Sequence, residues 1–65
     1  MIAYVKVKEL IKLLEADGFE MVRQRGDHRQ FKKQGWTKVV TVPGHLSDTL
    51  KPGLLNSILK SAGLK

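Results

Sequence analysis

The chain has 65 residues, no cysteine and a formal net charge of +6 at pH 7. A chain of this length predicts one small domain over residues 1–65, and the lack of cysteine excludes a disulfide framework and a thiolate-bound zinc site. The apolar runs are too short for a membrane-spanning helix and no signal-peptide pattern is present, so we expect a cytoplasmic protein without a membrane partner.

The first predicted element is a helix that begins at Val7. Apolar residues recur at the spacing of one helix face through Leu14, charged residues occupy the other faces, and Gly18 supplies a stop signal. The apolar stripe consists of Val7, Leu10, Ile11 and Leu14.

Three short runs rich in β-branched and aromatic residues follow, at residues 19–24, 28–33 and 38–42. The turn sequences between them predict an antiparallel meander. Phe31 is the clear core residue of the middle run, so strict alternation places His28, Gln30 and Lys32 on the solvent face. The first run does not fix its faces, because Met21 and Val22 fall on opposite sides. Residues 43–51 are expected to be irregular.

A second apolar stripe predicts a helix near the end of the chain, with Pro52 suited to its first position and Gly63 ending it. The stripe consists of Leu55, Ile58, Leu59 and Ala62. The order α-β-β-β-α predicts an α+β fold of two layers, in which both helices pack on one face of a three-stranded antiparallel sheet.

Most of the positive charge lies in the middle third of the chain. Residues 21–38 contain six Lys or Arg against one Asp, whereas residues 1–20 sum to −1 and residues 39–65 to +2. The six cations are Arg23, Arg25, Arg29, Lys32, Lys33 and Lys38. This clustering favours a polyanionic partner, either nucleic acid or an acidic protein, and arginine suits bidentate contact with phosphate. A solvated, solubilising surface is the simpler alternative.

His28 follows a glycine turn inside this basic segment. An imidazole exchanges protons near neutral pH, so it can take the 2′-hydroxyl proton of RNA or protonate the departing 5′-oxygen. Nearby cations would stabilise charge on the phosphoryl oxygens. Position alone, however, favours a surface histidine with no chemical role.

Two further residues are accessory candidates. His45, placed by the preceding Pro43-Gly44, could be a second proton-transfer group, a phosphate contact or a loop-capping side chain. Trp36 could stack on a base, fill a partner's pocket or cover the edge of this protein's own core. No spacing resembles a metal-ligand pattern, and phosphate-binding glycine loops and nucleophilic serine arrangements are absent, so we expect neither a metal nor a cofactor.

Four pieces of the chain, in order, resemble the HicA family of toxins, also called YcfA-like. They are Leu13-Leu14-Glu15-Ala16-Asp17-Gly18-Phe19, the run Arg23-Gln24-Arg25-Gly26-Asp27-His28 with Phe31, Thr41-Val42-Pro43-Gly44-His45, and residues 50–64. The resemblance covers nearly the whole chain. It implies a double-stranded-RNA-binding-domain-like fold and a translation-independent mRNA interferase that arrests growth until a HicB antitoxin binds it.

The family's catalytic histidine follows a glycine-serine turn and corresponds to His28. Asp27 stands where serine is commonest, and its carboxylate could orient the imidazole or disfavour an approaching phosphate. The leading hypothesis is therefore a metal-independent endoribonuclease toxin in which Arg25, Arg29 and Lys32 or Lys33 hold the scissile phosphate. Alternatives are a non-catalytic RNA-binding module of the same fold and a basic face that docks an acidic protein. We expect an acidic antitoxin surface to mask His28 and the basic face.

Overall fold

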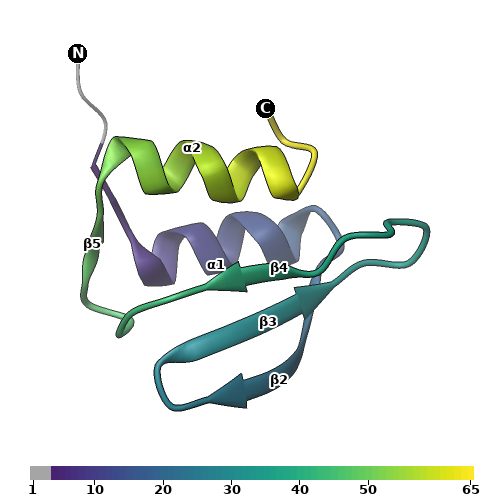
Figure 1. The fold of residues 1–65 in the computed structure, drawn as a ribbon, viewed down its shortest axis with the longest axis horizontal. Coiled ribbons are helices and arrows are strands. Elements are labelled where there is room, and N and C mark those ends of the chain that lie inside the picture. The colour runs from purple at the N-terminus through teal and green to yellow at the C-terminus, as the bar shows by residue number, and fades with distance from the viewer. Residues whose placement is uncertain (1–3) are drawn as a thin grey trace.

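A computed structural model describes residues 4–65 of the chain. The elements are β1 (Val5–Lys6), α1 (Val7–Ala16), β2 (Glu20–Arg25), β3 (His28–Lys32), β4 (Val40–Val42), β5 (Thr49–Leu50) and α2 (Pro52–Ser61). Strands β2, β3 and β4 form an antiparallel sheet in that order, with both helices on one side of it (Figure 1). The predicted α+β fold with its α-β-β-β-α order is confirmed.

The core lies between the helices and one face of the β2-β3-β4 sheet. Both predicted helix stripes point into it: Val7, Leu10, Leu14, Leu55, Ile58 and Ala62 are buried, and Ile11 and Leu59 pack against them. The sheet contributes Phe31, Val40 and Val42, each at most 1% exposed. Burying a large apolar side chain stabilises the fold by about 1.5–3 kcal/mol, so this contact holds the two layers together. We call the sheet face without helices the open face.

Strand β2 contains a bulge at Val22, which decides the face of its arginines. Met21 lies opposite Phe31, but the next residue of β2 that pairs with β3 is Arg23. Without the extra residue, strict alternation would turn Arg23 and Arg25 toward the helices. The bulge instead brings both arginines to the open face.

The segment after β4 is more ordered than the sequence predicts. Thr49–Leu50 forms β5, which pairs with β1, so the expectation of an irregular stretch from 43 to 51 is wrong at this point. The preceding loop covers the start of α1, where the backbone N–H of Val7 donates to the Asp48 carbonyl at 2.9 Å and that of Lys8 to the Leu46 carbonyl at 3.1 Å. The loop thus satisfies two N–H groups that a helix start leaves unpaired.

Candidate nucleic-acid interface

Side chains from three strands meet on the open face. Arg25 lies opposite His28 on β3, and Gln30 lies opposite both Arg23 on β2 and Thr41 on β4. Directly opposed residues in an antiparallel sheet share a face and lie close together. These five residues line one hollow of about 230 Å³, which we call the basic hollow. Small-molecule pockets measure about 300–1,000 Å³, so this smaller site suits part of a larger polyanion.

The β2–β3 turn positions His28. Gly26 has a φ of 59° and the following residue has a negative φ, the pattern of a two-residue type II′ turn. The His28 side chain is 60% exposed, and its Nδ1 lies 3.5 Å from Oδ1 of Asp27. The imidazole is therefore open to solvent, beside a carboxylate, and directly across the hairpin from Arg25.

Arg29 and Lys33 do not join His28, because they alternate onto the helix-covered side with Phe31. The Arg29 guanidinium donates from Nη1 to the Gly44 carbonyl at 2.8 Å. The Lys33 ammonium lies 2.7 Å from Oδ2 of Asp17. These two cations secure a loop and a helix end, whereas the sequence hypothesis assigned them to a phosphate.

The remaining lysine candidates are exposed but lie outside the basic hollow. Lys32 is at the far end of β3, opposite Glu20, about 13 Å along the strand from His28 at 3.3 Å per residue. Lys38 precedes β4, which begins at Val40, so the predicted strand start at residue 38 is two residues too early. Both can extend a positive surface toward a long ligand.

His45 is exposed in the loop that covers α1. Its backbone N–H donates to Oδ2 of Asp48 at 3.0 Å, and its carbonyl accepts from the Asp48 N–H at 3.0 Å. Its side chain does not line the basic hollow.

Trp36 lies against the end of α2. Its indole N–H donates to the Ser61 carbonyl at 2.8 Å, and a Cβ added at Gly63 would lie 2.6 Å from its ring. The half-buried ring also lies 5.6 Å from the Lys33 ammonium. This placement favours the reading in which Trp36 covers the edge of the core.

Gln30 and Thr41 belong to the basic hollow but were not among the candidate site residues. Alternation around Phe31 already placed Gln30 on the solvent face, and Thr41 alternates with two buried valines. Both are neutral, so neither charge nor histidine content singles them out. The signal that could have found them is their position on the same sheet face as His28.

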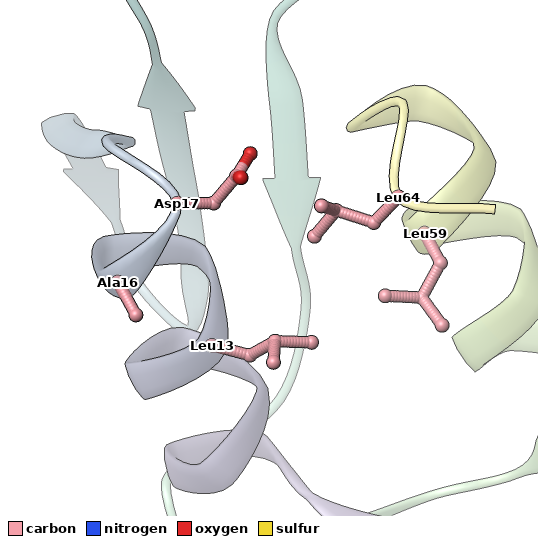
Figure 2. A pocket seen from close by; sticks show the side chains of 5 residues that line it. All are labelled: Leu13, Ala16, Asp17, Leu59 and Leu64. Atoms are coloured by element: carbon pink, nitrogen blue, oxygen red, sulfur yellow. The ribbon is translucent and has the colours of Figure 1, made fainter.

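A second depression lies between the helices. Leu13, Ala16 and Asp17 of α1 and the turn after it face Leu59 and Leu64 across a space of about 340 Å³ (Figure 2). It is lined mostly by apolar side chains and contains none of the candidate residues. His28 lies instead on the open face, where it lines the basic hollow.

Within the described part of the chain, no group of three or more His, Cys, Asp or Glu could hold a metal ion. No helix within residues 4–65 has the length and apolar character needed to cross a membrane.

The fold and the site define a class of protein: a small double-stranded-RNA-binding-domain-like α+β domain with a histidine and arginines on its open sheet face. A family model described as the HicA toxin of bacterial toxin-antitoxin matches residues 7–64. The chain belongs to this HicA toxin family, and membership implies an antitoxin partner. A comparison with curated proteins finds no match.

Proposed function

We propose that this toxin is an endoribonuclease that cleaves mRNA independently of translation, with His28 as its general acid or base. The observation that carries the proposal is the basic hollow, where Arg23 and Arg25 line the same surface as His28. Membership of a toxin family supports the proposal, because it gives the chain a toxin role. The arginines attract and hold a phosphate, and the imidazole moves a proton beside it.

The chemistry needs only the substrate's own nucleophile. The 2′-oxygen attacks the adjacent phosphorus, the P–O2′ bond forms, and the bond from phosphorus to the 5′-oxygen breaks. His28 takes the 2′-hydroxyl proton or gives a proton to the departing 5′-oxygen, and solvent water makes the other proton transfer. Arg23 and Arg25 stabilise the charge on the phosphoryl oxygens. The products are a 2′,3′-cyclic phosphate and a 5′-hydroxyl.

Asp27 is a positioning residue in this scheme. Its carboxylate lies 3.5 Å from Nδ1 of His28, which is close enough for a slight turn of the imidazole to complete a hydrogen bond. With the Nδ1 proton held in this way, Nε2 is the nitrogen that exchanges a proton with RNA.

The proposed contacts to the scissile phosphate differ from those of the sequence hypothesis. Arg25 keeps its role, but Arg23 replaces Arg29 and Lys33, because both of these bond to other groups on the helix-covered side. Lys32 is a contact for a neighbouring phosphate, since it shares the open face at a distance.

The test is a His28→Ala variant incubated with labelled RNA in the presence of chelator. We expect cleavage to fall by about 10²–10⁴-fold, the usual worth of a general acid or base. RNA affinity should change little, because the arginines remain. The side chain is exposed, so the unfolding midpoint should also stay unchanged.

His28→Gln is the matched control, since it keeps a polar side chain but cannot shuttle protons at neutral pH. Undiminished cleavage by either folded variant would remove His28 from the mechanism. A wild-type chain that binds RNA but makes no new ends would instead be a non-catalytic RNA-binding module.

We also infer that the antitoxin places acidic side chains over the basic hollow. Opposite charge would speed association, and a covered His28 could not reach RNA. Competition between RNA and antitoxin for one chain tests this arrangement, and a ternary complex with RNA still in the hollow would contradict it.

A further inference from the structure

Another hollow, distinct from the depression between the helices, adjoins the basic hollow where β4 meets α2. Its volume is about 250 Å³, and none of its lining residues is charged. The lining residues are Val39, Thr41, Leu54, Ser57, Ile58 and Ser61. We call this site the α2 hollow. It combines aliphatic surface with hydroxyl groups, whereas the basic hollow combines cations with an imidazole.

Thr41 joins the two hollows. It lines both of them, with Gln30 and the arginines on one side and Ser57 of α2 on the other. The two hollows are therefore adjacent and share Thr41 as part of their walls. The α2 side of this junction is fixed, because the Ser61 carbonyl accepts the hydrogen bond from Trp36.

The chemistry of the α2 hollow matches a nucleobase. A base has a flat face that packs on apolar groups and an edge of donors and acceptors, and sequence-specific recognition of single-stranded RNA uses both. Val39, Leu54 and Ile58 supply the apolar contact. Hydroxyl groups both donate and accept, so Ser57 and Thr41 can pair with a base edge. A phosphate would find no cation among the lining residues.

We propose that the α2 hollow binds the nucleobase next to the phosphate held in the basic hollow, and so sets the sequence preference of cleavage. This inference rests on the proposed ribonuclease function. One sugar connects the base and the phosphate of a nucleotide, which fits two hollows that share a residue. Ser57 and Thr41 are then specificity-determining residues.

The experiment uses a short RNA that carries one 2′-deoxy sugar at its cleavage site, which removes the nucleophile. Abasic nucleotides replace each position in turn, and affinity is measured by fluorescence anisotropy. With the wild-type chain, we expect one abasic position beside the cleavage site to weaken binding about fivefold, the low end of what a base stacked on an aromatic ring contributes, because the contacts here are aliphatic. Other positions should matter less.

Ser57→Phe fills the α2 hollow from an exposed helix position. This variant should bind intact RNA as weakly as the wild type binds the abasic RNA, with no further loss on the abasic RNA itself. Asn56→Phe is the control, because Asn56 is on α2 but does not line the hollow. Thr41→Val is the alternative variant if Ser57→Phe fails to fold. It keeps the side-chain shape and removes a hydroxyl, so it should alter the preferred base.

The possible outcomes distinguish a failure of this inference from a failure of the proposed ribonuclease function. If the wild type cleaves RNA but no abasic position weakens binding, or if Ser57→Phe and Asn56→Phe behave alike, the α2 hollow is not a base site and the ribonuclease proposal stands. If the wild type neither binds nor cleaves RNA, the proposed function fails and this inference fails with it.

Discussion

At the scale of single residues, the face of the sheet decides what an arginine does. Arg25 and Arg29 lie within one hairpin and have the same chemistry. Arg25 is exposed opposite His28, while Arg29 is half-buried and bonds to the Gly44 carbonyl. An exposed cation contributes to ligand binding at little cost in stability, whereas a partly buried one that satisfies a carbonyl contributes to the fold.

The two arginines should therefore give opposite results when each is changed to glutamine. Arg25→Gln should weaken RNA binding and leave the unfolding midpoint unchanged. Arg29→Gln should lower that midpoint by roughly 5 °C or more, because loss of a hydrogen bond from a charged donor costs about 1.5–3 kcal/mol in a small domain. Binding isotherms and thermal unfolding followed by circular dichroism measure both effects. The reverse pattern would show that Arg29, rather than Arg25, holds the phosphate.

At the scale of secondary-structure elements, the bulge in β2 builds the site. Val22 is the unpaired residue between Met21 and Arg23, and it is exposed. Bulges often redirect side chains beside functional sites. Here the bulge places Arg23 and Arg25 on the open face, while Met21 stays on the helix-covered face.

Two deletions in β2 test this role of the bulge. Deleting Val22 makes the strand regular and leaves both arginines on the open face, so RNA affinity should stay within about 0.5 kcal/mol of the wild type. Deleting Gln24 also makes the strand regular, but it turns Arg23 toward the helices and should lower the slope of log affinity against log salt by about 0.7, the value for one phosphate contact. Equal slopes for the two deletions would contradict the assigned register.

The sequence predicts the helices and the middle strand well, because each has one unambiguous apolar pattern. Phe31 fixes the face of β3, and the open position of His28 follows from it. The face of Arg23 could not be predicted, since a bulge in a run with apolar residues of both parities leaves no periodic signal. The β1–β5 pair was missed because two-residue strands are too short to show alternation.

At the scale of the whole molecule, position matters more than net charge for the proposed interface. The formal net charge is +6, yet the cations are spread over the helices as well as the sheet. Lys8 and Lys12 are exposed on α1, the layer behind the open face. Counterion release counts the phosphates that are neutralised locally, so these lysines should contribute little to RNA binding.

Two double variants that each remove two positive charges separate these contributions. Arg23→Gln with Arg25→Gln should lower the slope of log affinity against log salt by about 1.4, for two contacts to single-stranded RNA. Lys8→Gln with Lys12→Gln should leave the slope unchanged. A titration of RNA affinity from low to physiological salt gives both values, and equal slopes for the two variants would mean that RNA responds only to overall charge.

The β1–β5 pair also has a consequence for the order of folding. It joins Val5 to Leu50, across most of the chain, whereas a two-residue turn joins β2 to β3 and a seven-residue connection joins β3 to β4. Closing a long loop costs more entropy than closing a hairpin, and chains rich in local contacts fold sooner. The sheet is complete by Val42, so the residues of the basic hollow can pair before β5 and α2 pack against the rest of the chain. The α2 hollow would then be assembled last, because its lining needs α2 in place beside β4.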